Sequence, residues 1–350
     1  MPRLRRADCS LPGIVRRRAG KGFTYIAPDG SKVTDPEVLD RIRILAIPPA
    51  WTDVWICMDP WGHVQAMGTD AKGRRQYRYH DKWRERRDRE KFEHMLDFAA
   101  ALPRLRQAAA EHLSEQGLTK QRVLACAVRL LDLGFFRIGT EGYAEENQTY
   151  GLATMRRKHV HVDGDVITFD YTAKSGKRRV QSVADPDVVA VVSELKARRG
   201  GGYELLAYEC DGRWFDVKSS DINAYIKDVT GGEFTAKDFR TWSATVLAAV
   251  ALAVSSGVAS SKTARKRAIS RAMKEVSDYL GNTPTVARSS YVDPRVIDRY
   301  QGGVTILEAL EEMDEETGLG GLSTHGTIEE AVLDLLSDAS NARVAERIAA

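Results

Sequence analysis

The sequence predicts an α+β fold: a small β-rich N-terminal domain, then a larger, mostly α-helical domain that carries a short β-hairpin sheet. Three observations support this fold class. Short extended segments punctuated by turns fill residues 22–80. From Asp81 onward, apolar residues recur with helical spacing. Residues 158–183 interrupt that pattern with extended segments joined by tight turns. A chain of 350 residues is long enough for two domains and a sizeable core.

Composition and charge divide the chain further. We expect an N-terminal domain at residues 1–90, a helical domain at 91–318 and an acidic C-terminal tail helix at 319–350. Residues 308–350 hold eleven acidic and two basic side chains, whereas the whole chain has a net charge of +3, so the preceding part carries +12. A basic body with an acidic tail is typical of nucleic-acid binders.

The elements of the N-terminal domain are predicted from turn residues. Residues 1–20 are rich in arginine, and we expect them to be mobile at the start. Turn sequences with Pro, Asp and Gly separate the extended segments that follow. The expected strands are Gly22–Ile26, Val54–Met58 and Val64–Met67.

Basic and aromatic side chains alternate in the stretch Gly73–His80. Arginine suits DNA phosphates, and glutamine or tyrosine suits base edges. The candidate DNA contacts here are Arg74, Arg75, Gln76, Tyr77 and Tyr79. An edge strand exposed to solvent would show the same pattern. Residues 72–91, however, carry ten basic and four acidic residues, which favours the interpretation as a DNA-binding segment.

The helical domain begins with helices predicted at Lys82–Ala101 and Leu105–Gln116. Thr119 is an N-cap for a third helix that ends at Gly134, and Arg137 follows on its exit. The apolar face expected for this helix consists of Val123, Cys126, Ala127, Leu130 and Leu131. Three strands follow, with Asp163-Gly164 as one turn and Lys174 at or near the tip of the other.

Two further helices are predicted near the C-terminus. Thr235 and Asp238 form the capping box of the first, which holds Arg240 in its first turn. The residues that this helix is expected to bury are Phe239, Trp242, Val246, Val250 and Val254. The next helix is expected to end at Gly281 and to bury Ile269, Met273, Val276 and Leu280. We expect a hinge at Gly318–Gly321 before a last amphipathic helix at Ile328–Leu336.

Tyr291 lies between a Thr-Pro and an Asp-Pro helix start, and three cations precede it in defined settings: Arg137, Lys174 and Arg240. A phenol has a pKa of about 10, so it attacks only where cations favour its anion. Those cations would also stabilise charge on phosphate oxygens, and arginine does so bidentately. Each residue alone has an ordinary reading: a packed tyrosine, a salt-bridged arginine, a solvated hairpin lysine. Asn282 is either an amide donor to phosphate or a helix-end asparagine.

Several function classes lack their motifs. The sequence has no GxxxxGK[ST] loop, so nothing predicts nucleotide hydrolysis. No carboxylate or His/Cys cluster indicates a metal site, and a structural or backbone-contact role is favoured over metal ligation for His159 and His161. We expect no metal and no cofactor. Four dispersed cysteines fit a reducing compartment, and neither a signal peptide nor a membrane span is evident, so we expect a cytoplasmic protein.

Taken as an ordered set, these segments resemble type IB DNA topoisomerases of the small, poxvirus-like branch, especially bacterial ones. The stretches that match are Phe136-Arg137-Ile138-Gly139, Tyr143-x3-Asn147-x-Thr149-x-Gly151-Leu152-x-Thr154, Lys174, Lys237-Asp238-Phe239-Arg240-Thr241-Trp242, Leu280-Gly281-Asn282-Thr283-Pro284 with Tyr291, and Gln76-Tyr77-x-Tyr79. The resemblance covers roughly residues 20–310. Many members of the family carry histidine where Asn282 stands.

The resemblance implies a C-shaped clamp around duplex DNA, with residues 1–90 as a DNA-binding domain and 91–318 as the catalytic domain. It implies that Tyr291 forms a 3′-phosphotyrosyl link, that Arg137, Arg240 and Asn282 hold the non-bridging oxygens, and that Lys174 protonates the leaving 5′-oxygen. Further DNA contacts that it implies are Tyr143, Asn147, Thr149 and Lys237. Supercoils would relax without ATP or metal, in a monomeric, nucleoid-associated enzyme.

Two other functions stay open from the residues. A tyrosine recombinase or integrase uses the same kind of constellation, but typically with His-x-x-Arg where this chain has Lys237-x-x-Arg240. A non-enzymatic DNA-binding protein would explain the basic body, but not the ordered set that ends at Tyr291. We expect deletion of residues 319–350 to leave relaxation intact, since an acidic tail repels DNA.

Overall fold

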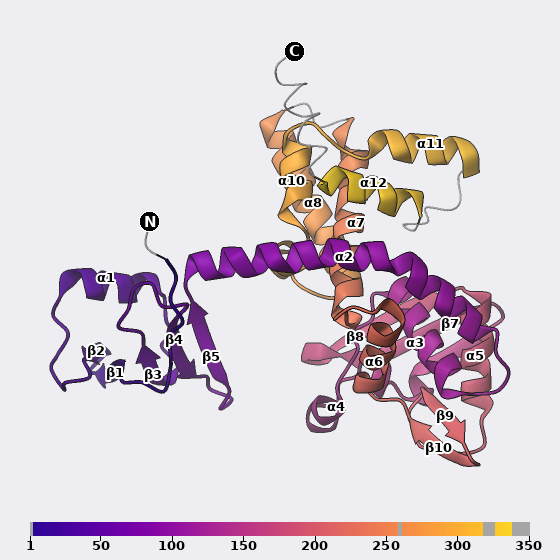
Figure 1. The fold of residues 1–350 in the computed structure, drawn as a ribbon, viewed down its shortest axis with the longest axis horizontal. Coiled ribbons are helices and arrows are strands. Elements are labelled where there is room, and N and C mark those ends of the chain that lie inside the picture. Colours follow the sequence, from indigo (N-terminus) through magenta and orange to yellow (C-terminus); the bar gives the residue numbers. More distant parts are fainter. Residues whose placement is uncertain (1–2, 258–260, 318–325, 338–350) are drawn as a thin grey trace. The chain divides into compact units, whose positions relative to one another are not determined.

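The structure is a computed structural model that describes residues 3–257, 261–317 and 326–337. The chain divides into two compact units, residues 1–93 and 94–350. The first contains a five-stranded sheet, and the second is built from helices with small antiparallel sheets (Figure 1). The predicted α+β class is confirmed.

The first unit is an antiparallel sheet with the strand order β2-β1-β3-β4-β5. The strands are β1 (Ile14–Ala19), β2 (Gly22–Ile26), β3 (Thr52–Ile56), β4 (Val64–Thr69) and β5 (Arg75–Tyr79). Helix α1 (Pro36–Ile44), which the turn pattern did not predict, begins at the N-cap Asp35 and packs Ile42 into the core with Ile14, Val54, Ile56 and Ala66.

Residues 14–19 of the Arg-rich N-terminal segment form strand β1, which the sequence did not predict and which pairs with both β2 and β3. The Arg16 guanidinium donates hydrogen bonds to the carbonyl oxygens of Ile47, Pro48 and Trp51 at 2.6–3.2 Å. Those bonds hold a charged side chain against the sheet, so the arginines do not prevent strand formation.

Helix α2 (Asp81–Leu113) is one helix, so the prediction of two helices is wrong. Pro103 lies inside it, and a proline removes one helical hydrogen bond. Leu102 and Leu105 flank the proline and are 1% and 0% exposed. Burial on both sides of Pro103 therefore outweighs the local defect.

Helix α3 (Lys120–Gly134) lies at the centre of the second unit, where it contacts α5, α6, α7 and β9. Its predicted N-cap is confirmed, since Thr119 accepts a hydrogen bond from the Arg122 amide at 3.1 Å, and its predicted apolar face is fully buried. The helices that surround it or follow are α4 (Glu141–Asn147), α5 (Pro186–Ala197), α6 (Ser219–Thr230), α7 (Ala236–Ser256) and α8 (Lys262–Leu280).

The predicted three-stranded sheet is confirmed, with the order β6-β7-β8. Its strands are β6 (Val160–Asp163), β7 (Val166–Ala173) and β8 (Lys177–Val183), and Lys174 begins the tight turn between the last two. A second hairpin, β9 (Ala207–Cys210) with β10 (Arg213–Asp216), was not predicted.

The capping box that opens α7 is confirmed, and so is the end of α8 at Gly281. Val254 is 66% exposed, so the prediction that it is buried is wrong. Residues spaced by four advance about 40° more than a full turn at each step, because a turn holds 3.6 residues. A face that starts at Phe239 has therefore rotated away from the core by Val254.

Short helices complete the second unit: α9 (Pro284–Ser290), α10 (Pro294–Gln301), α11 (Leu307–Thr317) and α12 (Thr327–Leu336). Helix α12 confirms the predicted last helix and packs against α7, α10 and α11 (Figure 1). The hinge expected at Gly318–Gly321 lies outside the described residues.

Helix α7 is the one helix, among those described, that is long and apolar enough to cross a membrane, and 67% of its apolar window is buried within the structure. It therefore has the character of a core helix. All four cysteines are free thiols.

Candidate functional site

A cavity of about 310 Å³ in the second unit brings together four of the five predicted catalytic residues. They are Arg137, Lys174, Arg240 and Tyr291, and the predicted DNA contacts Thr149 and Lys237 also line the cavity. The fifth candidate, Asn282, adjoins them, since Arg137 donates a hydrogen bond to its side-chain oxygen. Segments spread over 155 residues of sequence thus meet at one cavity.

The chain after α3 is shaped to present Arg137. Phe135 has a left-handed backbone (φ 53°), and the amides of Leu152 and Ala153 then donate to the carbonyls of Arg137 and Ile138 at 2.8 and 2.7 Å. Gly139 has φ +76°, and a Cβ there would come within 2.8 Å of the Gly151 backbone. The motif glycines therefore allow two backbone segments to touch, which fixes the direction in which Arg137 leaves the helix.

Arg240 joins the ends of two helices. It is only 4% exposed, and its guanidinium donates to the Phe135 carbonyl and, at 2.8 Å, to the Leu280 carbonyl. These acceptors lie where α3 and α8 end, and helix ends leave carbonyl groups without helical partners. The Arg240 Nε has no hydrogen-bond partner in the part of the chain that the structure describes.

Asn282 leaves α8 through Gly281, whose φ of +64° ends the helix, and its backbone amide bonds to the Ser277 carbonyl at 2.9 Å. Its side-chain oxygen is taken by Arg137. The side-chain nitrogen is buried and has no partner within the described residues. Asn282 therefore keeps a free N–H donor beside the cavity.

Tyr291 stands at the C-terminal end of α9, and its backbone carbonyl accepts a hydrogen bond from the Thr245 hydroxyl at 3.2 Å. The Arg240 guanidinium lies 5.4 Å from the centre of its ring. Burial raises the pKa of Tyr291, but the charges of Arg240 and Arg137 outweigh burial and leave the pKa below its ordinary value.

Burial and the charge of Arg137 lower the pKa of Arg240 to about 10. Arg240 therefore stays protonated at neutral pH, and two cations face the phenol at close range. Charge of this kind favours the phenolate, which is the nucleophilic form of tyrosine.

Lys174 is exposed at the β7–β8 turn, and its ammonium group makes no hydrogen bond or ion pair with any described residue. Two basic neighbours, Arg178 and Arg179, already form hydrogen bonds with other residues. Arg178 bonds to the Asp170 carboxylate at 2.6 and 2.9 Å, and Arg179 donates to the carbonyls of Asp278, at 2.9 Å, and Tyr279. The hairpin is thus anchored to the end of α8, while Lys174 is left for the cavity.

The predicted DNA contacts of the second unit have different surroundings. Thr149 is 8% exposed, and its hydroxyl has no described partner. Lys237 is exposed on the first turn of α7, and Asn147 is exposed at the end of α4. Tyr143 lies in α4, and its side chain is outside the described part.

The predicted contacts of the first unit lie on or next to the edge strand β5. Arg75, Tyr77 and Tyr79 alternate along its exposed face, and the two tyrosine rings stack with centroids 6.0 Å apart. Arg74 and Gln76 instead bond to the Asp70 carboxylate at 2.7–3.0 Å, and hydrogen bonds from Arg74 hold the pKa of Asp70 well below its usual value. Arg75, Tyr77 and Tyr79 thus form the exposed face of β5 and remain the predicted DNA contacts of this strand.

The hydrogen-bond donors around the cavity indicate which kind of ligand it can bind. The Asn282 side-chain nitrogen, the Arg240 Nε and the Thr149 hydroxyl are buried without partners among the described residues, and unpaired buried donors are costly. An anion with several acceptor oxygens would satisfy them beside the tyrosine. No group of three or more metal-ligating side chains gathers among the described residues. His159 packs its ring against Tyr150 at 4.5 Å and accepts a bond from the Arg156 amide at 3.2 Å, a structural role.

A half-buried tyrosine among cations is the type of site that enzymes use for covalent chemistry on phosphate esters. Comparison with known families defines the class: residues 80–317 match the catalytic core of eukaryotic DNA topoisomerase I, and residues 22–70 match the N-terminal domain of bacterial DNA topoisomerase IB. The chain belongs to the type IB DNA topoisomerase family, and it is an enzyme of the isomerase class that acts on DNA.

Individual relatives agree with the family match. The chain is 32% identical over 296 residues to DNA topoisomerase 1B of Acanthamoeba polyphaga mimivirus, which covers 83% of this chain and 88% of that protein. It is 22% identical over 286 residues to DNA topoisomerase 1B of vaccinia virus (strain Copenhagen), or 80% and 87% of the two chains. A shorter match, 28% over 161 residues, relates it to DNA topoisomerase 1 of Daucus carota and covers 45% of this chain and 19% of that one.

Two residues that support the site were missed from the sequence. Thr245 lies in an apolar stretch of α7 and is fully buried. A threonine among apolar residues was the signal in the sequence that its hydroxyl needs a hydrogen-bond partner inside the fold. Glu329 opens α12 and is 9% exposed, yet its capping-box position reads as an ordinary helix start. Neither residue reveals its long-range partner without the fold.

Proposed function

We propose that this enzyme relaxes supercoiled duplex DNA by transient cleavage of one strand, with Tyr291 as the nucleophile. The phenolate oxygen attacks a backbone phosphorus, a 3′-phosphotyrosyl bond forms, and the bond from phosphorus to the 5′-oxygen breaks. Rotation of the cut duplex follows, and the 5′-hydroxyl then attacks the phosphotyrosyl bond to restore the strand and free Tyr291.

One observation carries this proposal: buried donors that have no partner among the described residues lie in or next to a cavity that also holds a tyrosine of lowered pKa. Arg137, Arg240 and Asn282 donate to the two non-bridging oxygens, whose charge grows in the transition state. The link between Arg137 and Asn282 holds those two donors together. An amide nitrogen donates without titrating, so Asn282 fills the place where many relatives carry histidine.

Lys174 gives a proton to the departing 5′-oxygen in cleavage and takes it back in religation. The absence of a described partner for its ammonium group supports this role, because a general acid must be free to reach the leaving group. The phosphotyrosyl link conserves the energy of the phosphodiester, so the cycle runs without ATP and without metal.

DNA binding involves both units in this proposal. Residues 1–90 form a DNA-binding domain that presents Arg75, Tyr77 and Tyr79, assisted by Arg74 and Gln76, and residues 91–318 form the catalytic domain with contacts from Tyr143, Asn147, Thr149 and Lys237. The two domains close around the duplex as a C-shaped clamp. The enzyme acts as a monomer in the cytoplasm, at the nucleoid.

The proposal predicts relaxation of a supercoiled plasmid by the purified protein in EDTA and without ATP. Tyr291→Phe should lose relaxation by at least about a thousandfold, because no other group can form the covalent link. Tyr279→Phe is the matched control, since Tyr279 is 49% exposed on α8 and is not among the candidates. Activity in Tyr291→Phe, or its absence in the wild-type protein, would contradict the proposal.

A further inference from the structure

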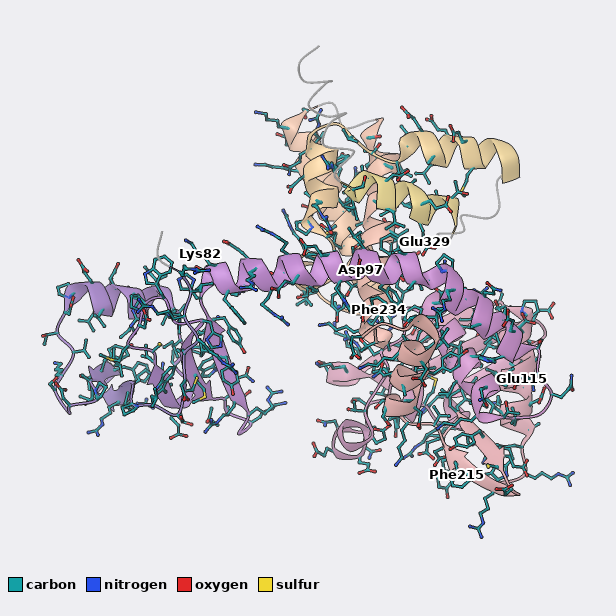
Figure 2. All side chains as sticks on the ribbon, in the orientation of Figure 1. Lys82, Asp97, Glu115, Phe215, Phe234 and Glu329 are labelled. Carbon is teal, nitrogen blue, oxygen red and sulfur yellow. The ribbon has the colours of Figure 1, made fainter. Side chains whose placement is uncertain are left out.

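A buried carboxylate lies just beyond the part of the chain that matches the family's catalytic core, which ends at residue 317. Glu329 opens α12, is 9% exposed and faces the segment of α2 that belongs to the second unit (Figure 2). Carboxylates are almost never this buried unless they are paired. Its partners therefore indicate what α12 does.

Glu329 accepts a hydrogen bond from the Gly326 amide at the start of its own helix, at 3.3 Å, and from three donors on two other helices. The Trp242 indole N–H donates to Oε1 at 2.7 Å, and the Arg106 guanidinium donates to both carboxylate oxygens at 2.5 and 2.9 Å. Arg106 also holds Asp132 through bonds of 2.8 and 2.9 Å. Burial alone would lower the pKa of Arg106, but the two carboxylates raise it above its ordinary value, so the cluster is firmly charged.

The partners of Glu329 stand close to the catalytic arginines in sequence. Trp242 is on α7, two residues after Arg240, and is 1% exposed. Asp132 is on α3, and Arg137 leaves that helix five residues later. Through Arg106, one carboxylate thus ties together the two helices that present Arg240 and Arg137.

The other end of α12 reaches the helix that follows Tyr291. Its last carbonyls, those of Leu335 and Leu336, accept bonds from Arg299 at 3.2 Å and from Arg295 at 3.4 Å, both on α10. Arg295 also forms an ion pair with Asp293 at 2.6 Å. Asp293 is fully buried and lies two residues after Tyr291 in the sequence. A single helix therefore contacts the supports of the nucleophile and of both arginines.

We propose that α12 is a positioning element of the cleavage site and that Glu329 is its positioning residue, a role that rests on the function proposed above. Glu329 touches neither DNA nor the reacting atoms; it fixes α7 against α3, so that Arg240 and Arg137 keep their geometry around Tyr291. This assignment replaces our expectation that residues 319–350 are dispensable for relaxation.

The test measures single-turnover cleavage of a duplex at saturating protein, together with the Kd for the same duplex. Glu329→Ala is compared with Glu330→Ala, which removes an exposed carboxylate from the next position of α12. We expect Glu329→Ala to slow cleavage about 10- to 100-fold with a Kd within about twofold of wild type, because small displacements of catalytic groups have effects of that size. Glu330→Ala should cleave normally, and Glu329→Gln, which still accepts from Trp242, should recover most of the rate.

A second readout separates positioning from mere loss of fold. If Arg240 moves away from Tyr291 in Glu329→Ala, the pH profile of cleavage should shift to higher pH, whereas partial unfolding lowers the rate equally at every pH. Should Glu329→Ala fail to fold, Trp242→Phe removes the indole N–H donor together with part of the buried ring volume, and the same two measurements decide the question.

The proposal is overturned if a folded Glu329→Ala protein cleaves at the wild-type rate, or if its rate falls with no change in pH profile and no rescue by glutamine. Failure of the proposed function looks different, because the wild-type protein itself would then form no covalent complex.

Discussion

At the scale of single residues, the site is defined by donors that the folded chain leaves unused. Two nitrogens of the Arg240 guanidinium donate to helix-end carbonyls, and the side-chain oxygen of Asn282 accepts a hydrogen bond from Arg137. Both side chains still have a buried N–H group without a partner among the described residues. Leaving such groups unpaired costs of the order of 1–3 kcal/mol each. A phosphodiester that supplies the missing acceptors recovers that cost on binding, so the donors are organised before DNA arrives.

Lys174 differs from those donors because it is exposed and its ammonium is uncommitted among the described residues. If it protonates the leaving 5′-oxygen, Lys174→Ala should slow cleavage of a normal duplex by about 100- to 10,000-fold, the usual contribution of a general acid. On a duplex with a bridging 5′-sulfur, which departs without a proton, the loss should be small. Single-turnover cleavage of the two duplexes makes the comparison.

Lys177→Ala is the control for that experiment, because Lys177 is an exposed lysine at the other end of the same turn. Equal losses on the oxygen and sulfur duplexes in Lys174→Ala would remove its role as the acid and leave it a DNA contact.

At the scale of elements, the site is built where helices end. The cavity receives Arg137 from beyond α3, Tyr291 from the end of α9 and Lys174 from the β7–β8 turn, and Asn282, from beyond α8, adjoins it through Arg137. Only Arg240 stands inside a helix, in the first turn of α7. Side chains at such ends are set by a few backbone and cap contacts, so the contacts that fix each exit matter as much as the catalytic groups.

Thr245 is the clearest of these fixing contacts. Its hydroxyl accepts from the Asp293 amide at 3.2 Å and shares its proton between the carbonyls of Thr241, at 2.9 Å, and Tyr291, at 3.2 Å. Thr245→Val keeps the shape and removes the hydroxyl, so both bonds between α7 and the turn that holds Tyr291 are lost. We expect cleavage to fall about tenfold or more. The free energy of unfolding should fall by about 1–3 kcal/mol, since the Asp293 amide is left buried and unpaired.

Ser243→Ala is the matched variant, since the Ser243 hydroxyl bonds only to the Phe239 carbonyl of its own helix at 2.8 Å. Single-turnover cleavage and a denaturant titration of both variants check the prediction. A Thr245→Val protein that loses stability but cleaves like the wild type would show that the contact supports the fold and not the nucleophile.

The elements also show how far local sequence reaches. Thr119, the Asp163-Gly164 turn and the Thr235–Asp238 box were sufficient to predict where helices and hairpins begin, because each signal acts within one turn. Continuity through Pro103 in α2 depends on burial contributed by distant helices, which no local pattern contains. The candidate residues were likewise predictable from motif order, whereas their supports, Thr245 and Glu329, act across 46 and 87 residues.

At the scale of the whole molecule, charge is divided between basic surfaces and an acidic C-terminal segment. The described part of that segment is not a free tail, because α12 packs on α7, α10 and α11 and buries Glu329. The exposed acids Glu308, Glu311 and Glu312 of α11 are not among the described residues that line the cavity. Negative charge is therefore held in a fixed place, and the basic residues remain for the duplex.

Affinity that depends on phosphate contacts must fall with salt, because each neutralised phosphate releases counterions. For Tyr291→Phe, which binds without cleaving, we expect a plot of log Kd against log salt concentration to be linear and steep.

Arg75→Gln in that background should weaken binding to all sequences alike and reduce the slope by about 0.9, the value for one phosphate contact. Arg75 suits this test because it lies on the exposed face of β5. Arg43→Gln is the matched control, since Arg43 is also exposed but its charge is paired with Asp40. A flat salt response, or equal slopes for Arg75→Gln and its parent, would exclude β5 from the phosphate contacts and with it the role of the N-terminal unit in holding DNA.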